Sequence, residues 1–291
     1  MLIKDKLFLA SQYLAPKHLV SQLFGYASDS QAPTLKNWMI SRFIRRYGVD
    51  LREAQIEDPM AYESFNAFFT RALKDDARPI DDDPSCVICP ADGTISQLGA
   101  VDHGRIFQAK GHSYSVTELL GGSVERAEPF LGGDCATIYL SPKDYHRVHM
   151  PVSGTLREMV HIPGRLFSVN PLTAHHVPNL FARNERVACL FDTEQHGPMA
   201  VVLVGAMIVA SIETVWAGLV ATQKRVVRAT RYDAQAYPPI HLKKGAEMGR
   251  FKLGSTVIVL FGSNKIRWAD TPSVRGHVRM GEALALPGAA S

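Results

Sequence analysis

The sequence predicts an α+β fold in which N-terminal helices precede a mostly antiparallel β domain. Apolar residues recur at helical spacing before residue 48, and short runs rich in β-branched residues appear in the later part of the chain. Gly and Pro punctuate those later runs. Because the helical patterns come first and the strand patterns follow, the order favours α+β over alternating βαβ units.

Residues 1–75 are predicted to form a helical, membrane-associating region. Its clearest helix carries five apolar residues at helical spacing: Leu35, Trp38, Met39, Phe43 and Tyr47. Thr34 directly precedes this pattern and is expected to cap the helix. The first 50 residues hold seven basic and three acidic residues, which accounts for the whole net charge of +4. Such a helix either lies in a membrane interface, packs on the protein's own core, or presents a solvated charged face.

Residues 76–291 are predicted to form a β-rich catalytic domain. Strands are expected at Thr137–Leu140, Met199–Ile212 and Thr256–Phe261. The apolar run Met199–Ile212 has 14 residues, fewer than the about 20 that a membrane-spanning helix needs. We therefore expect buried strands there and only peripheral contact with a membrane. The tail from about residue 281 is expected to fray.

The four cysteines favour a reducing compartment with free thiols. Cys86 and Cys89 form a lone C-x-x-C pair, and no second pair follows. The segment between them reads as a short buried strand, so we expect core thiols and no metal site. No signal peptide is recognisable at the N-terminus.

Three short segments carry residues suited to chemistry. Gly254 and Ser255 lie before the last predicted strand, His146 and His149 lie in a histidine-rich segment, and Asp92 lies in Pro-Ala-Asp-Gly. A serine, a histidine and an aspartate can form a nucleophile, a base and an orienting acid. However, Ser255 lacks the G-x-S-x-G elbow of many hydrolases. Taken separately, Gly-Ser is an ordinary turn, and each histidine is an ordinary structural residue without metal-site spacing.

Together these segments resemble the bacterial phosphatidylserine decarboxylases, the pyruvoyl-dependent, prokaryotic type I-like family. Leu253-Gly254-Ser255-Thr256 matches the family's self-processing site, Asp144-Tyr145-His146-Arg147-Val148-His149-Met150-Pro151 its histidine motif, and Pro90-Ala91-Asp92-Gly93 its aspartate motif. The likeness runs from the N-terminal helices to about residue 262. It includes Phe65-Asn66-Ala67-Phe68-Phe69, Ala109-Lys110-Gly111-His112, Leu166-Phe167-Ser168-Val169-Asn170 and Gly245-Ala246-Glu247-Met248-Gly249-Arg250-Phe251.

The resemblance implies that the chain cuts itself between Gly254 and Ser255. Asp92 would orient His149 and favour its charged form, and His149 would take the proton from Ser255. Ser255 would attack the carbonyl of Gly254, so that the amide becomes an ester. β-Elimination would release a β chain of residues 1–254, and the dehydroalanine left on the α chain, 255–291, would hydrolyse to a pyruvoyl group and ammonia. Glycine at 254 suits this attack because it has no Cβ.

The resemblance further implies that this pyruvoyl group, derived from Ser255, is the covalent cofactor. It would form a Schiff base with phosphatidylserine, assist the loss of CO₂ and release phosphatidylethanolamine for phospholipid biosynthesis. His146 is our candidate for a second role that belongs to decarboxylation alone, as a proton donor. Asp144 is a weaker candidate, because it can simply shape the turn before the motif.

Because the implied substrate is a two-chain lipid, the resemblance also favours docking of the basic helix on an anionic membrane surface. We expect a peripheral protein on the cytoplasmic side of the cell membrane, a homodimer, and no nucleic-acid partner. Three alternatives remain open. They are a pyruvoyl decarboxylase that acts on a soluble amino acid, a non-catalytic lipid-binding module with an uncut chain, and a serine lipase that keeps Ser255 intact.

Overall fold

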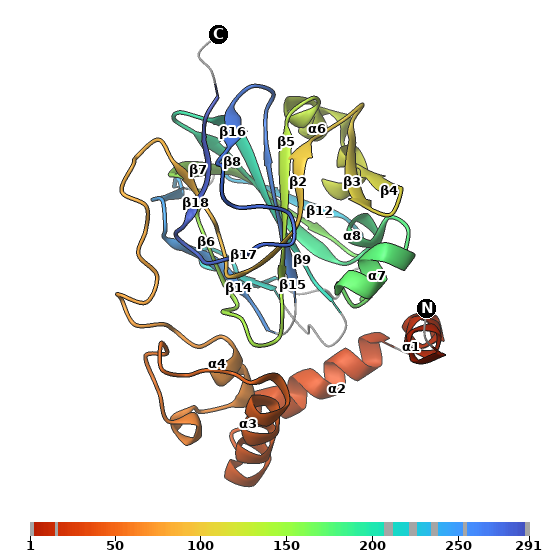
Figure 1. Ribbon diagram of the computed structural model, residues 1–291, viewed down its shortest axis with the longest axis vertical. Coiled ribbons are helices and arrows are strands. Elements are labelled where there is room, and N and C mark those ends of the chain that lie inside the picture. The colour runs from red at the N-terminus through yellow and green to blue at the C-terminus, as the bar shows by residue number, and fades with distance from the viewer. Residues whose placement is uncertain are drawn as a thin grey trace.

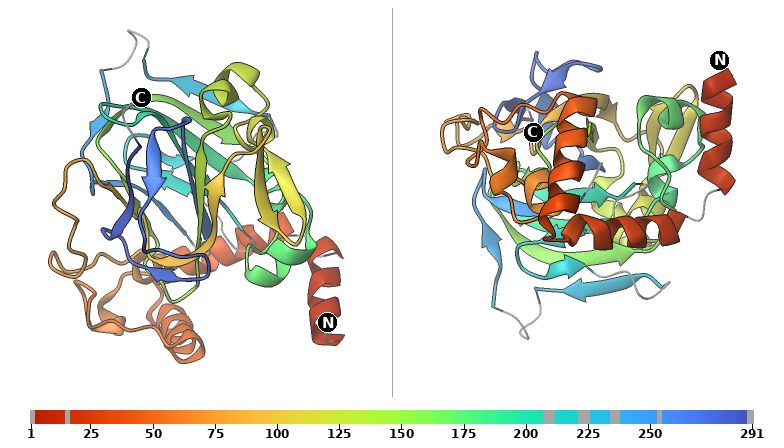
Figure 2. Two further views of the ribbon diagram at one scale, coloured as in Figure 1. Left: turned by 45° about the horizontal axis from the view of Figure 1, so that its top comes forward. Right: turned by 90° about the horizontal axis from the view of Figure 1, so that it is seen from below.

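The helices at the start of the chain gather at one end of a large β-rich body (Figure 1). The two further views in Figure 2 show the same arrangement. This computed structural model describes residues 3–14, 17–206, 212–220, 226–233, 238–252 and 255–288. The α+β class that the sequence predicts is confirmed, with helices first and antiparallel strands after them.

The helices fall into an N-terminal group and a set of short connectors. They are α1 (Ile3–Leu14), α2 (Lys17–Asp29), α3 (Pro33–Tyr47), α4 (Phe65–Phe69), α5 (Val116–Leu119), α6 (Val124–Ala127), α7 (Pro171–His176) and α8 (Leu180–Arg183), with 3₁₀ turns at η1 (Pro59–Ala61) and η2 (Glu128–Phe130).

The strands begin after the N-terminal helices and continue almost to the end of the chain. They are β1 (Val87–Ile88), β2 (Gly93–Ala100), β3 (Arg105–Ala109), β4 (His112–Ser115), β5 (Asp134–Leu140), β6 (Arg147–His149), β7 (Gly154–Ile162), β8 (Arg186–Thr193), β9 (Gly197–Val204), β10 (Ile212–Thr214), β11 (Gly218–Val220), β12 (Arg228–Arg231), β13 (His241–Leu242), β14 (Glu247–Phe251), β15 (Ser255–Phe261), β16 (Ile266–Trp268), β17 (His277–Val278) and β18 (Ala283–Pro287).

A nine-stranded antiparallel sheet forms the centre of the body, in the order β12-β7-β8-β9-β15-β5-β2-β17 with β13 also paired to β7. Strand β15 lies between β9 and β5. Its side chains alternate between two cores, because Ile258 and Leu260 join one apolar cluster while Val257, Val259 and Phe261 join the other. Because both faces of β15 are buried, most of its residues are apolar and they form a continuous apolar run in the sequence.

Three smaller sheets complete the β body. Strands β11, β10, β14 and β6 form the largest of them, β1, β18 and β16 form the second, and β3 and β4 form a hairpin. The tail prediction is wrong as far as residue 287, because β18 pairs with both β1 and β16 and buries Leu284 and Ala285. The short buried strand between Cys86 and Cys89 is confirmed as β1, and all four cysteines are free and buried.

An aromatic cluster joins the N-terminal helices to one another. The ring centroid of Phe43 on α3 lies 5.2 Å from that of Phe65, 6.1 Å from that of Phe68 and 5.7 Å from that of Phe69, all three on α4. Met39 is buried on the same helix, whereas Trp38 keeps 60% of its surface exposed. Helix α3 therefore packs one side on the protein's own core and leaves a mixed aromatic and basic side uncovered.

Two details of the helical prediction are wrong. Residue 34 is not the cap of α3, because the helix starts at Pro33 and its N-cap is Ala32, which makes no side-chain capping bond. Proline at the first helical position has a φ angle already suited to the helix, so the helix begins two residues earlier than predicted. The region also lacks an α-helix between residues 48 and 64, where only the 3₁₀ turn η1 occurs.

The apolar run that begins at Met199 continues β9 as far as Val204 and resumes at Ile212, the first residue of β10. Residues 207–211 lie outside the described residues. In the part of the chain that the structure describes, none of the helices is long and apolar enough to cross a membrane.

We expect Ile258→Ala to destabilise the fold strongly, because Ile258 is fully buried in the central strand. Removing so large a buried side chain costs about 2–5 kcal/mol of the free energy of unfolding. Urea unfolding, followed by circular dichroism in a Ser255→Ala background in which we expect the chain to stay whole, would measure the loss. Val124→Ala is the control, since Val124 is 70% exposed and its loss should change that free energy by about 0.5 kcal/mol or less. Equal effects of the two substitutions would contradict the burial of β15.

Candidate active site

The three chemistry-bearing segments meet at one edge of the central sheet. Strand β15 begins at Ser255, which pairs with Leu140 at the end of β5. On the other side of β5, Thr94 near the start of β2 pairs with Tyr139, and Asp92 lies two residues before Thr94. The antiparallel register thus brings the start of β15, the end of β5 and the start of β2 together.

Ser255 is fully buried, and its Oγ has no hydrogen-bond partner among the residues that the structure describes. Thr256 is also fully buried, and its Oγ1 is likewise unpaired within the described part of the chain. Buried hydroxyl groups ordinarily find partners, so an unpaired one is a mark of a site with another role. Gly254, the other half of the predicted cleavage site, lies outside the described residues.

His149 is held at both ring nitrogens. Its Nδ1 lies 2.8 Å from the carbonyl oxygen of Gly245, and its Nε2 lies 3.0 Å from the hydroxyl of Tyr145. A carbonyl oxygen can only accept, so Nδ1 carries the proton and Nε2 accepts from Tyr145 in the neutral ring. Burial lowers the pKa of His149. The ring is therefore neutral and oriented with Nε2 as its basic atom.

His146 is more deeply buried than His149. Its Nδ1 donates to the carbonyl oxygen of Asp144 at 2.8 Å, and its ring lies 4.0 Å from the ring of Phe69, centroid to centroid. Its Nε2 has no partner within the described ranges. Burial lowers the pKa of His146 to about 3, so the ring is neutral and presents a bare lone pair at Nε2.

Asp92 is paired with an arginine. Its Oδ1 accepts from Nε of Arg78 and from the backbone N–H of Met280, both at 2.9 Å, and its Oδ2 accepts from Nη2 of Arg78. Among the described hydrogen bonds, none joins Asp92 to His149. In this state the partner that orients His149 is Gly245, and Asp92 acts on His149 only through its charge.

Two family models match most of the chain. The family model for phosphatidylserine decarboxylase matches residues 65–286, and a second model, described as PSD, matches residues 7–48. This chain belongs to the phosphatidylserine decarboxylase family. It is 75% identical over 287 residues to the phosphatidylserine decarboxylase proenzyme of Bordetella petrii, covering 99% of both chains. It is 67% identical over 287 residues to the proenzyme of Pseudomonas aeruginosa, again covering 99% of both. The name proenzyme denotes a precursor that gives a processed form.

Four residues of the site were missed by sequence reasoning. Tyr145 lies inside the histidine motif, so its position was a signal that could have been used. Arg78, Gly245 and Met280 contact the site from distant segments. No spacing in the sequence predicts those three contacts, because they depend on how loops pack across the edge of the sheet.

An apolar cavity of about 470 Å³ lies beside the site in this decarboxylase-family chain. Aromatic and aliphatic side chains dominate its walls, including Trp38, Met39 and Phe69, and Arg42 and Arg46 also border it. Because Phe69 also contacts the ring of His146, one side chain separates the cavity from that histidine.

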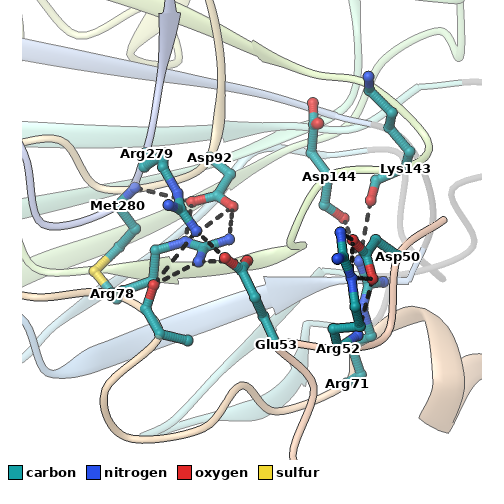
Figure 3. Close-up of polar contacts among 11 residues, drawn as sticks. Asp50, Arg52, Glu53, Arg71, Arg78, Asp92, Lys143, Asp144, Arg279 and Met280 are labelled. Atoms are coloured by element: carbon teal, nitrogen blue, oxygen red, sulfur yellow. Dashed lines mark hydrogen bonds and ion pairs between the residues drawn. The ribbon is translucent and has the colours of Figure 1, made fainter. Parts of the chain in front are cut away.

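A smaller, polar cavity of about 280 Å³ lies next to the Asp92 carboxylate. Figure 3 shows the polar contacts that Asp92 makes with Arg78 and Met280. Arg71, Arg78, Tyr145 and Arg279 are among the residues that border it. An apolar cavity and a polar cavity therefore both lie beside the site. Groups of three or more His, Cys, Asp or Glu side chains that would suit a metal ion do not occur in the described residues.

The lowered pKa of His146 predicts a loss of stability in acid. The unfolded chain takes up a proton near pH 6.5, whereas the folded site does so only at about pH 3. The neutral His146 ring therefore makes its full contribution to the free energy of unfolding above about pH 6.5. That contribution is lost as the pH falls from there toward about 3. In Ser255→Ala protein, the free energy of unfolding should fall between about pH 6.5 and pH 4, and His146→Gln should make that fall shallower. Replacing the exposed His241 by Gln is the control. An unchanged slope in His146→Gln would show that His146 is not a source of the pH dependence.

Proposed function

We propose that this chain is a phosphatidylserine decarboxylase that cuts itself between Gly254 and Ser255 and converts phosphatidylserine to phosphatidylethanolamine and CO₂. The observation that carries the proposal is Ser255. It is a fully buried serine whose hydroxyl has no partner in the described part of the chain, and it is the first residue of a strand that is paired on both sides. It also lies within the segment that the family model matches.

The proposed cut needs one base and one nucleophile. Ser255 Oγ attacks the carbonyl carbon of Gly254 while His149 Nε2 takes the hydroxyl proton, and the peptide bond becomes an ester. His149 suits this role because its Nδ1 is fixed by Gly245 and its Nε2 is the basic atom. The Asp92 carboxylate stabilises the imidazolium that forms. Elimination across Cα and Cβ of residue 255 then releases a carboxylate at Gly254, and water converts the remaining dehydroalanine to a ketone with loss of ammonia.

The ketone that results is a pyruvoyl group at position 255, and it supplies an electron sink for the loss of CO₂ when it is formed. The residues around it fit such a group, because Thr256 brings a hydroxyl and His146 a ring nitrogen to the same edge of the sheet, and both lack partners among the described residues. His146 Nε2 is an acceptor in this state, since Nδ1 carries the proton. It must therefore take a proton before it can return one to the substrate's α-carbon. Asp144 supplies the backbone carbonyl that fixes this ring.

The apolar cavity supports a lipid as the substrate rather than a soluble amino acid. Its aromatic walls suit acyl chains, while Arg42 and Arg46 are exposed cations at its border. The contact between Phe69 and His146 brings this cavity beside the reacting groups. A decarboxylase for free serine or aspartate would have no use for an aromatic cavity of this kind.

The exposed side of α3 supports docking on a membrane. Trp38 is 60% exposed, and Arg42, Arg45 and Arg46 are exposed on the same helix. Aromatic and basic side chains of this kind suit the interface between head groups and acyl chains. We accordingly infer a peripheral position on the cytoplasmic side of the cell membrane. Assembly as a homodimer, which the family resemblance suggests, stays a prediction.

Intact-protein mass spectrometry under denaturing conditions tests the proposed processing. We expect two chains, one ending at Gly254 and one beginning with a pyruvoyl group at position 255. Ser255→Ala should leave one uncut chain, and the processed wild type should release CO₂ from phosphatidylserine in mixed micelles. His146→Ala should still be cut but should lose decarboxylation.

Three results would count against the proposal. A wild-type chain that stays whole during prolonged incubation with anionic lipid would contradict the processing step. A cut chain that releases CO₂ from free serine or aspartate, but not from phosphatidylserine, would favour the soluble-substrate alternative. A His146→Ala enzyme with wild-type decarboxylation would remove His146 from the mechanism.

We expect the triple substitution of Arg42, Arg45 and Arg46 by Glu to weaken binding to anionic vesicles. Each cation near such a surface contributes about 1 kcal/mol, and the substitution also adds repulsion. Vesicle sedimentation at low salt is the measurement. The control replaces Arg228, Lys265 and Arg267 by Glu, since these exposed cations lie outside the N-terminal helices. Equal sedimentation of the two triple variants would show that α3 is not the docking surface.

A further inference from the structure

The Asp92 carboxylate is enclosed by partners that all hold it in one position. Arg78 binds it with two nitrogens, and the backbone N–H of Met280 binds its Oδ1. The side chains of Arg78 and Asp92 are 9% and 7% exposed. A two-pronged contact of this kind fixes the plane and the distance of a carboxylate, which a single charge does not.

Arg78 is itself anchored on its far side. Its Nη1 donates to Oε2 of Glu53 at 2.8 Å and to the carbonyl oxygen of Ala77 at 2.6 Å. Every nitrogen of this guanidinium therefore has an acceptor, and the group cannot turn without breaking several bonds. Figure 3 shows Arg78 between Asp92 and Glu53, with Arg279 beside them.

Three distant segments of the chain meet at this arginine. Glu53 follows the helix α3, Arg78 precedes the first strand, and Arg279 with Met280 lies beyond Ser255. Glu53 accepts from Arg279 as well as from Arg78. Because Glu53 is 46% exposed, its ion pairs are screened by water and add less than the buried pair of Arg78 and Asp92.

We propose that Arg78 is a positioning residue for self-processing: it holds the charged Asp92 carboxylate in a fixed place beside His149. This inference rests on the proposed function. Asp92 makes no hydrogen bond to His149 among the described contacts, so its effect on the imidazolium is electrostatic. An electrostatic effect of this kind depends on a fixed distance, and the two-pronged contact with Arg78 supplies it. The N–H of Met280 makes the C-terminal segment a second support for the same carboxylate.

The test measures the rate of self-cleavage in Arg78 variants of the full chain by denaturing gel and mass spectrometry. Arg78→Ala should slow cleavage by about 10- to 100-fold, as expected for a misplaced catalytic group. Arg78→Lys should lie between Arg78→Ala and the wild type, because an ammonium cannot bind the carboxylate with a planar fork. Added ethylguanidinium should restore cleavage in Arg78→Ala, since it can bind in the space that the side chain vacates, and should not accelerate the wild type.

Arg126→Ala is the matched control. Arg126 binds Glu158 with two nitrogens at 2.8 and 2.9 Å, and their side chains are 12% and 15% exposed. This pair joins α6 to β7, and the strand registers put Glu158 level with Leu260, at the opposite end of β15 from Ser255. We expect Arg126→Ala to lower the midpoint temperature of unfolding, as Arg78→Ala does. Its rate of self-cleavage should equal that of the wild type and should not change when ethylguanidinium is added.

The outcomes separate this inference from the function on which it rests. Rapid cleavage of the wild type with equal rates for Arg78→Ala and Arg126→Ala would overturn the role of Arg78 alone. Slow cleavage of Arg78→Ala that ethylguanidinium does not restore, together with equally slow cleavage of Arg126→Ala, would show a general structural effect and would also overturn it. A wild-type chain that never cleaves would overturn the proposed function, and the inference with it.

Discussion

The position of β15 inside the central sheet is the constraint on which the rest of the site depends. From Thr256 onward the strand is paired with β9 on one side and with β5 on the other, whereas within the described ranges Ser255 pairs with β5 alone. Ser255 is thus the point at which double pairing ends. The ladder fixes its backbone, and the neighbouring strands bring the histidine and aspartate segments to the same edge.

The general architecture of this chain could be predicted from its sequence because it depends on local patterns. The continuous apolar run of β15 follows from burial on both faces, and the spacing of Met39 and Phe43 follows from a helix that packs one side on the core. The start of α3 was predicted wrongly because a proline at the first helical position overrides the signal of a nearby threonine. The tail was predicted wrongly because small, polar residues were taken as frayed, whereas β18 finds partners on both sides.

In the candidate site, the side chains could be predicted from the sequence but their hydrogen-bond partners could not. Ser255, His149, His146 and Asp92 could be named from motifs, since these residues lie in short segments of distinctive sequence. Their partners could not, because the carbonyl oxygen of Gly245 accepts from His149 and the N–H of Met280 donates to Asp92, and almost every residue type provides such backbone groups. A motif tells which side chains are present but not which backbone atom each of them faces. For that reason the orientation of His149 by a carbonyl, in place of a carboxylate, is visible only in the folded chain.

The burial of β15 has a consequence for how the two pieces of a processed chain behave. A fragment that begins at residue 255 contributes the central strand of the sheet and, further on, β16, β17 and β18, which pair with strands from the N-terminal piece or with one another. Neither piece can leave without opening the sheet and exposing both apolar cores to water. The two pieces of one precursor therefore stay together for the life of the folded protein, and subunits of different origin would exchange them only by unfolding.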